Sequence, residues 1–151
     1  MPELPEVETV VRGLRRHILG QTLTAVSFAS RRVALANARG WKSQTSGEQV
    51  GQIERLGKYI IVRFMSGNAL VIHLRMTGRL WIKPSSYHRE RHDRFVLPLS
   101  DGRQLVLSDT RQFGRIDWVA PYSPARHRGL SKLGPDALTI TKAQFADICS
   151  Q

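Results

Sequence analysis

The sequence predicts a mainly β fold with helices (α+β), in which a two-layer antiparallel β-sandwich follows an N-terminal helix. Three observations predict it: apolar residues recur at helical spacing near the N-terminus, short strand-like runs fill most of the remaining chain, and turn-forming residues separate neighbouring runs. The length of 151 residues suits one domain, and 41% apolar residues are enough to bury a core. This composition excludes a collagen, a coiled coil, a disordered tail and a disulfide scaffold.

The first predicted element is a helix over residues 5–19. Its apolar residues recur three and four positions apart and fall on one face: Val7, Val10, Val11, Leu14 and Ile18. Pro5 suits a first helical position, where no N–H is needed, and Gly20 suits the end of the helix. Acidic residues in the first turn and basic residues in later turns favour the same helix through its dipole.

Eight short strands are predicted after the helix. They cover residues 22–28, 50–56, 59–64, 69–74, 80–82, 94–99, 104–107 and 114–119. The turn-forming sequences SGN at 66–68 and SDG at 100–102 predict antiparallel hairpins. Residues 121–134 are polar and loop-like, and residues 136–151 are expected to begin a second helix.

The charge balance indicates a polyanionic partner. Twenty-three Lys and Arg residues against twelve Asp and Glu residues give a formal charge of +11, and most of the cations are Arg. A guanidinium presents a flat fork of donors that matches phosphate oxygens. The single cysteine, Cys149, cannot form an internal disulfide or a metal site, which favours a reducing compartment. Because we find no signal peptide and no apolar run of membrane-spanning length, we expect a soluble, cytoplasmic protein.

Pro2 and Glu3 are the first candidate catalytic residues. Initiator methionine is normally removed before proline, which would leave Pro2 as a free secondary amine. An α-amino group titrates at about 7.7–8.0, so part of it is unprotonated and nucleophilic near neutrality. Addition of this amine to an aldehyde-like carbon gives a cationic iminium, and Glu3 beside it could move a proton. The alternative from these two residues alone is that they only start the helix.

Several short motifs carry a resemblance to a known family. They are PELPEVET at 2–9, LGKYI at 56–60, HLRMTG at 73–78, RHD at 91–93, DTRQFG at 109–114 and LGPD at 133–136. In order and spacing they resemble formamidopyrimidine-DNA glycosylases, bacterial base-excision enzymes that remove oxidised purines. Leu4 favours this branch over the endonuclease VIII relatives, which usually begin PEGPE.

The resemblance implies catalytic roles for three residues. Pro2 would attack the sugar C1′ and form a Schiff base, and Glu3 would assist ring opening and proton transfer. Lys58 would act in acid–base steps near the lesion and contact phosphate. From its position alone, Lys58 heads an apolar strand, where an ordinary surface lysine is the alternative.

Four further positions resemble the family's DNA-contacting residues. Met76, Arg111 and Phe113 would fill the gap left by an extruded base, because flipping a nucleotide costs a few kcal/mol of stacking. Arg111 and His92 would contact DNA, His92 at phosphate. Taken singly, Met76 and Phe113 could be core residues, and His92 could belong to a solvated charged loop. In a strand, Arg111 and Phe113 would share a face. Gly78 and Gly114 indicate turns that could expose Met76 and Phe113.

The family also implies parts that this sequence does not contain. We expect a glycosylase catalytic domain over 1–131 and, at 132–151, a linker and the start of a helix–two-turn–helix region. The family binds one Zn²⁺ through a C-terminal four-cysteine finger, whereas this chain has one cysteine, so we expect no metal or other cofactor here. The chain would then be a fragment, weakly active or inactive alone.

The function predicted from these residues is base-excision repair by a bifunctional DNA glycosylase and AP lyase acting on 8-oxoguanine and formamidopyrimidines. The expected partner is damaged double-stranded DNA, bound by a monomer in the bacterial cytoplasm at the nucleoid, with no membrane. Two alternatives remain open: a non-catalytic DNA-binding module, and a tautomerase that uses an N-terminal proline as general base.

Overall fold

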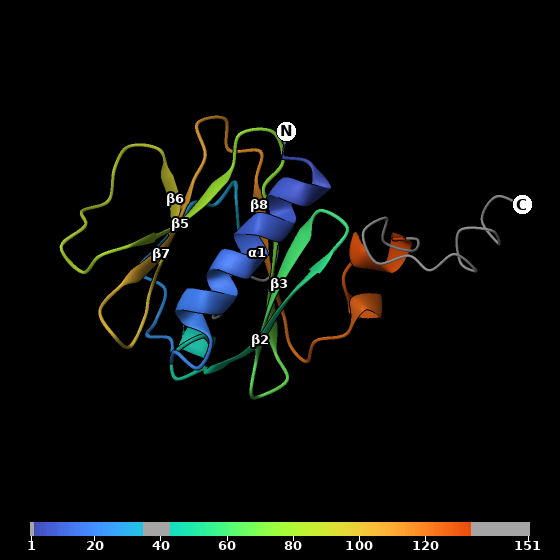
Figure 1. The fold of residues 1–151 in the computed structure, drawn as a ribbon, viewed down its shortest axis with the longest axis horizontal. Helices are drawn as coiled ribbons and strands as arrows, with labels where there is room; N and C mark the ends of the chain where they lie inside the picture. Colours follow the sequence, from blue (N-terminus) through green and yellow to red (C-terminus); the bar gives the residue numbers. More distant parts are fainter. Residues whose placement is uncertain (1, 35–42, 134–151) are drawn as a thin grey trace, which may run out of the picture.

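Two antiparallel four-stranded sheets and one long helix make up residues 2–34 and 43–133, the part of the chain that this computed structural model describes (Figure 1). The first sheet has the order β1-β6-β7-β5 and contains β1 (Phe28–Ala29), β5 (Arg79–Lys83), β6 (Asp93–Pro98) and β7 (Gln104–Ser108). The second has the order β2-β3-β4-β8 and contains β2 (Val50–Leu56), β3 (Tyr59–Phe64), β4 (Ala69–His73) and β8 (Arg115–Val119). The predicted fold class is therefore confirmed.

Helix α1 (Leu4–Ile18) begins and ends within one residue of the predicted bounds. Its first turn is closed by a capping box, in which the Glu6 carboxylate accepts the Glu3 backbone N–H at 3.1 Å. The buried face carries apolar residues from successive turns: Val7, Val11, Leu14 and Ile18. Basic residues occupy the last turn, as the helix dipole favours.

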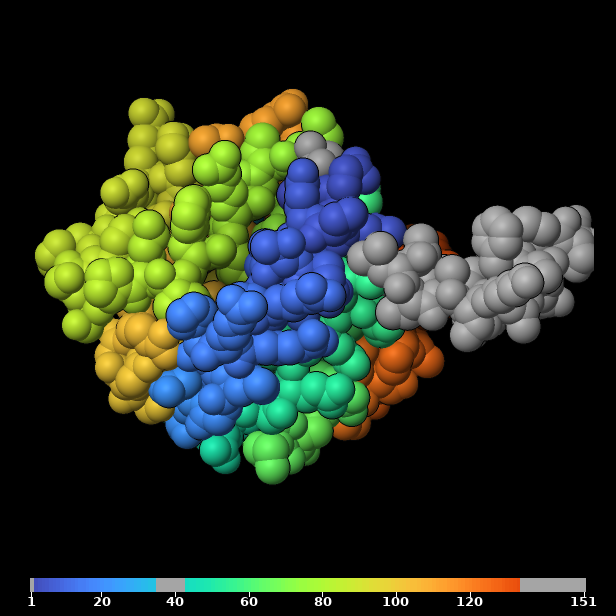
Figure 2. Space-filling view, in the orientation of Figure 1, coloured from blue at the N-terminus to red at the C-terminus, as the bar shows by residue number. Residues whose placement is uncertain are grey.

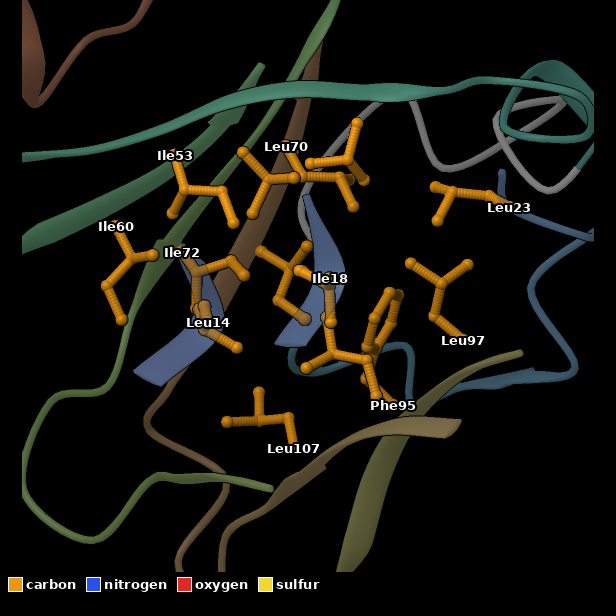
Figure 3. Close-up of a cluster of buried hydrophobic side chains, with 14 of the residues drawn as sticks. Leu14, Ile18, Leu23, Ile53, Ile60, Leu70, Ile72, Phe95, Leu97 and Leu107 are labelled. Carbon is orange, nitrogen blue, oxygen red and sulfur yellow. The ribbon is translucent and has the colours of Figure 1, made fainter. Parts of the chain in front are cut away.

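The main core lies where α1 meets both sheets (Figure 3). Leu14 and Ile18 of the helix lie among side chains of the second sheet, such as Ile72, and of the first sheet, such as Phe95 and Leu107. Each of these residues is at most 3% exposed. Burial of a side chain of this size contributes about 1.5–3 kcal/mol, so the core holds the N-terminus of the chain firmly against the two sheets.

The two hairpins predicted from turn residues are present. Strands β3 and β4 are joined through Gly67, and β6 and β7 through Gly102. Both glycines have a left-handed backbone, with φ of +94° and +91°. Only glycine adopts this conformation readily, which explains why the turn sequences predicted the strand pairing correctly.

The strand predicted over 22–28 is wrong. Strand β1 is two residues long and pairs with β6, whereas Thr22 and Leu23 make only isolated bridges. Thr22 bridges Gln49 beside β2, and Leu23 bridges Leu99 beside β6. The segment therefore crosses from one sheet to the other and cannot keep a single ladder of hydrogen bonds.

The segment after β8 covers the outer face of the second sheet. Predicted as a loop, it contains two 3₁₀ helices, η1 (Pro124–Arg126) and η2 (Leu130–Lys132). A second apolar cluster forms there from Ile61, Ala69, Val71, Val119 and Leu130. His127 Nε2 lies 2.6 Å from Asp117 Oδ2, and His127 Nδ1 accepts the backbone N–H groups of residues 129 and 130. The helix predicted to begin at 136 lies outside the described residues.

Candidate functional site

The predicted site residues gather at one end of the molecule, where the start of α1 meets the loops before β5 and β8 (Figure 1). Figure 2 shows the dark-blue start of the helix against the green segment that precedes β5. An open cleft of about 650 Å³ lies here. Its lining combines the helix start with three loops: Pro2, Glu6, Met76, Thr77, Gly78, Arg79, His92, Ser108, Asp109 and Thr110. The fold thus brings Pro2, Met76 and His92 together from distant parts of the sequence.

Glu3 and Lys58 form an ion pair next to Pro2. Lys58 Nζ lies 3.3 Å from Glu3 Oε2, and the lysine side chain is 29% exposed. Lys58 lies in the tight turn between β2 and β3, directly after Gly57, whose φ is +57°. The turn directs the lysine toward the first residues of α1, so the three predicted catalytic residues are neighbours.

A partly buried ion pair fixes α1 to this hairpin. Arg55 Nε donates to Glu8 Oε2 at 2.6 Å, and Arg55 Nη1 donates to the Gly57 carbonyl at 3.0 Å. The Arg55 side chain is 2% exposed. Its hydrogen bond to Glu8 holds the pKa of that carboxyl below its usual range, against the opposing effect of burial. Because Glu8 is in α1 and Gly57 precedes Lys58, the pair sets the position of Pro2 relative to Lys58.

Asp109 joins the two loops that carry Met76, Arg111 and Phe113. We call residues 74–78 and 109–114 the cleft loops. Thr77 Oγ1 donates to Asp109 Oδ1, which also accepts the Arg111 N–H at 3.2 Å. Asp109 Oδ2 accepts the Gly114 N–H at 2.7 Å. The carboxylate is 1% exposed and serves three donors, so it fixes the two loops relative to each other.

Each cleft loop contains one residue in a left-handed backbone conformation, which residues other than glycine rarely adopt. Arg75 has φ +56° and Gln112 has φ +57°. A Cβ at Gly78 would lie 2.4 Å from the Leu74 carbonyl oxygen, so only glycine closes that turn. Left-handed backbone at non-glycine residues costs of order 1–3 kcal/mol and is often found at functional sites. The left-handed residues of the cleft loops therefore lower the stability of the folded chain.

The cleft loops present their large side chains to solvent. Met76 is 50% exposed and Phe113 is 44% exposed, so neither is a core residue. Arg111 and Phe113 both lie in the loop before β8, so the condition for sharing a strand face does not arise. They meet through a cation–π contact instead, with the Arg111 guanidinium 4.8 Å from the Phe113 ring centre.

His92 is exposed at the cleft, at the end of the loop between β5 and β6. Its carbonyl accepts the Asp109 N–H at 2.9 Å, which ties this loop to the cleft loops. Asp93 closes the same loop by accepting Tyr87 Oη at 2.5 Å and the Glu90 N–H at 2.8 Å. Burial raises the pKa of the Asp93 carboxyl, but these hydrogen bonds and one from Ser108 hold it below its usual value.

Two histidines without a predicted role, His73 and His127, are largely enclosed. The His73 ring stands edge-on to Tyr59 at 4.7 Å, and burial, with the charges of Arg75 and Lys58, lowers its pKa to about 4. Within residues 2–34 and 43–133, no three His, Cys, Asp or Glu side chains gather to hold a metal ion. Nor is any helix in the described ranges long and apolar enough to cross a bilayer.

Sequence reasoning missed Asp109, Thr77 and Arg79. An Asp that opens a loop commonly accepts a backbone N–H two residues on, which was the available signal for Asp109. No local signal identifies Thr77 as its partner, since the two residues are 32 positions apart.

Comparison with known proteins identifies the family. The chain matches the model of the formamidopyrimidine-DNA glycosylase N-terminal domain over residues 1–116. The formamidopyrimidine-DNA glycosylase of Geotalea uraniireducens is 40% identical over 139 residues, 92% of this chain and 51% of that protein. The Lactiplantibacillus plantarum enzyme is 35% identical over 136 residues, 90% of this chain and 50% of that protein. The chain spans about half the length of these curated relatives.

Solved structures show the same fold. The complex of Lactococcus lactis Fpg with DNA containing an abasic site superposes with a TM-score of 0.74 at 34% identity, over 78% of this chain and 44% of that one. MutM in complex with DNA containing carbocyclic 8-oxo-G gives a TM-score of 0.73 at 36% identity, over 78% and 44% of the two chains. The helix and sandwich are therefore the fold of a glycosylase N-terminal domain. The chain belongs to the formamidopyrimidine-DNA glycosylase family, as its sequence motifs predicted.

Proposed function

We propose that residues 1–131 are the catalytic domain of a bifunctional DNA glycosylase and AP lyase that removes 8-oxoguanine and formamidopyrimidines from duplex DNA during base-excision repair. The observation that carries the proposal is the cleft itself, which Pro2 lines together with Met76 and His92, while the next residue after Pro2, Glu3, is paired with Lys58. Relatives named formamidopyrimidine-DNA glycosylase, and structures of relatives in complex with DNA containing an abasic site, Fapy-dG or carbocyclic 8-oxo-G, support it.

Pro2 is the proposed nucleophile once Met1 has been removed. The lone pair of its nitrogen attacks the sugar C1′, the glycosidic bond breaks, and the base leaves with a proton. The Glu3 carboxylate takes the proton that the attacking nitrogen loses and passes it to the ring oxygen, so that the sugar ring opens and leaves a cationic iminium. The iminium draws electrons from the neighbouring carbon, which loses a proton while the 3′ phosphate leaves. Water finally releases Pro2.

Lys58 is proposed to assist these proton transfers. Its ammonium lies 3.3 Å from Glu3 Oε2, near enough to relay a proton to or from the carboxylate. It can also bind a phosphate of the damaged strand. The Glu8–Arg55 pair keeps this arrangement fixed while DNA enters the cleft.

Met76, Arg111 and Phe113 are proposed to enter the gap that an extruded base leaves. Two of them are large, exposed and apolar, and the third presents a guanidinium that can donate to the orphaned base. Inserting these groups offsets the few kcal/mol of stacking that base flipping removes. His92 and Arg111 would bind the DNA around that gap.

The family's helix–two-turn–helix region and zinc finger are not used in any of the proposed steps. Residues 132–151 are proposed to be a linker and the start of the helix–two-turn–helix region. A zinc site with four thiolate ligands does not fit a chain with one cysteine. None of the proposed steps therefore uses zinc. Damaged duplex DNA is the proposed partner, bound by one copy of the chain.

Borohydride trapping on abasic duplex DNA tests the proposal. Mass spectrometry first establishes that Met1 is absent from the purified chain. We expect a covalent adduct with the parent, a much slower one with Pro2→Gly, and normal DNA affinity but slow trapping with Glu3→Gln. If Pro2→Gly traps at the parental rate, Pro2 is not the nucleophile. If the parent binds DNA without an adduct, the chain is a non-catalytic DNA-binding module.

A further inference from the structure

Beside the cleft lies a surface on the outer face of the first sheet that none of the proposed catalytic steps uses. We propose that it binds the phosphate backbone of the duplex flanking the lesion and so extends the DNA track beyond the cleft. The inference rests on the proposed DNA-binding function. We name it the β5 surface; its residues are Phe28, Arg79, Trp81, Lys83, Tyr87 and Arg89.

Strand β5 supplies three of these side chains. Arg79, Trp81 and Lys83 alternate along the strand and so project from the same face of the sheet. Lys83 Nζ lies 4.7 Å from the centre of the Trp81 ring and 5.1 Å from that of Tyr87. The Arg79 guanidinium lies 5.9 Å from the same Trp81 ring, which is exposed. The aromatic rings thus hold two cations at the strand surface.

At the opposite edge of the sheet, a second cation lies over a second aromatic ring. Across the sheet, Trp81 pairs with Val106, Val106 with Val96, and Val96 with Phe28. The Arg89 guanidinium lies 3.8 Å from the Phe28 ring centre. Three strand spacings separate the two aromatic rings, roughly 14 Å. Each DNA strand carries one phosphate per about 3.4 Å of helix axis, so cations at the two ends are far enough apart to engage different phosphates of a single backbone.

The charges of this surface favour phosphate over other ligands. In the described part of the chain, no carboxylate lies within ion-pair distance of Arg79, Lys83 or Arg89. Asp93 acts on Lys83 at longer range, but its oxygens are occupied by Tyr87, Glu90 and Ser108. Cations face both aromatic rings, so a base would have to displace them before stacking. Cations held in place by rings also lose less freedom when they bind phosphate.

Arg79 connects the β5 surface to the cleft. It lines the cleft and also faces Trp81, because β5 begins directly after the cleft loop 74–78. In Figure 1, β5 leads away from the end of the molecule where the N-terminus lies. A backbone that leaves the cleft past Arg79 therefore meets Lys83 and, across the sheet, Arg89.

The test measures affinity for two abasic duplexes, one of about one helical turn and one of about two turns, by fluorescence anisotropy over a salt series. The variant Lys83→Ala/Arg89→Ala should bind the short duplex like the parent and lose the gain in affinity on the long one. Each lost phosphate contact lowers the slope of log affinity against log salt by about 0.9, so we expect a loss of about 1.8 on the long duplex. Trp81→Phe should keep this gain and Trp81→Ala should lose part of it.

A matched control removes the same charge elsewhere. Arg126 and Arg128 are exposed in the segment that covers the other sheet, so Arg126→Ala/Arg128→Ala should leave the long-duplex gain intact. Equal losses in the two double variants, or a parental slope in Lys83→Ala/Arg89→Ala, would overturn the inference. Borohydride trapping on the short duplex separates the two proposals. Absence of a parental adduct refutes the lyase, whereas a normal adduct with no effect of Lys83 and Arg89 refutes only the β5 surface.

Discussion

Asp109 is the residue on which the shape of both cleft loops depends. Its carboxylate accepts from Thr77, Arg111 and Gly114, and it is almost completely buried. In Asp109→Asn, the amide NH₂ would face one of these donors and leave it unsatisfied. A buried unsatisfied polar group costs about 1–3 kcal/mol. We expect a loss of stability of this size in denaturant unfolding, together with slower borohydride trapping.

Asp101→Asn is the control for that prediction. Asp101 lies in the exposed turn between β6 and β7 and bonds only to its near neighbour Arg103 among the contacts of the described chain. Its substitution should leave unfolding and trapping near parental values. A parental unfolding midpoint in Asp109→Asn would show that the loops hold their shape without the carboxylate.

His73 gives the fold a predictable dependence on pH. Its pKa falls from 6.5 to about 4 because of burial and the charges of Arg75 and Lys58, while its ring packs on Tyr59. Between pH 6.5 and 4 the unfolded chain therefore binds a proton that the folded chain resists. The contribution of neutral His73 is complete above pH 6.5 and is lost as the pH falls toward 4.

The variant His73→Asn isolates this effect. Asparagine keeps an acceptor for the Arg75 N–H, which His73 Nδ1 accepts at 3.0 Å, but it does not titrate. Unfolding free energies measured by denaturant across this pH range should fall less steeply for the variant than for the parent, by up to one bound proton. Parallel curves for the two proteins would contradict the low pKa of His73.

At the scale of elements, the segment after β8 depends on a close approach at Gly129. A Cβ there would lie 2.0 Å from Tyr59 Oη, although the backbone φ of −72° suits any residue. Gly129→Ala should therefore push η2 from the outer face of the second sheet and cost about 1–3 kcal/mol. Because Tyr59 follows Lys58, we also expect slower trapping. Thermal unfolding and trapping measure the two effects.

Gly13→Ala is the opposite case and the control. Gly13 lies inside α1, and a Cβ there meets nothing within 4 Å. Alanine is favoured over glycine in a helix by about 0.8–1.0 kcal/mol, so this variant should be more stable than the parent. If both alanine variants change stability in the same direction, the close approach of Gly129 to Tyr59 does not determine how η2 packs.

The sequence predicts elements well where one local signal decides them. The apolar spacing of α1 and the glycines of the two hairpins are such signals, and these elements were predicted nearly to the residue. The strand at 22–28 failed because its residues divide their pairing between two sheets, which no local pattern reveals.

The candidate site divides in the same way. Family motifs located Pro2 and Lys58, but the ion pair between Glu3 and Lys58 joins parts of the chain about 55 positions apart and is visible only in the fold. The motif at 109–114 located Arg111 and Phe113, but it did not reveal the left-handed Gln112 between them. Backbone strain of this kind has no sequence signature when the residue is not glycine.

For the whole molecule, the balance of charges leaves an excess of cations for the proposed partner, DNA. Many carboxylates of the described chain are occupied internally, among them Glu8 with Arg55, Asp101 with Arg103, and Asp109 with the cleft loops. The twelve Asp and Glu residues offset only about half of the 23 Lys and Arg residues, which leaves a formal charge of +11. Such a field attracts any duplex, so discrimination has to come from the cleft.

Arg111→Ala separates that general attraction from recognition of a gap. The 151-residue chain should bind undamaged duplex with a Kd of about 10⁻⁴ to 10⁻⁶ M at physiological salt, and the affinity should fall steeply as salt rises. Loss of Arg111 should weaken this binding only slightly, because it removes one charge among many. On duplex with an abasic gap the same change should cost about 1–3 kcal/mol, since the guanidinium beside Phe113 can then donate to the orphaned base. Fluorescence anisotropy on the two duplexes measures the difference, and Arg126→Ala, an exposed residue of η1, should affect both equally. An equal effect of Arg111→Ala on intact and gapped DNA would mean that Arg111 contributes only charge.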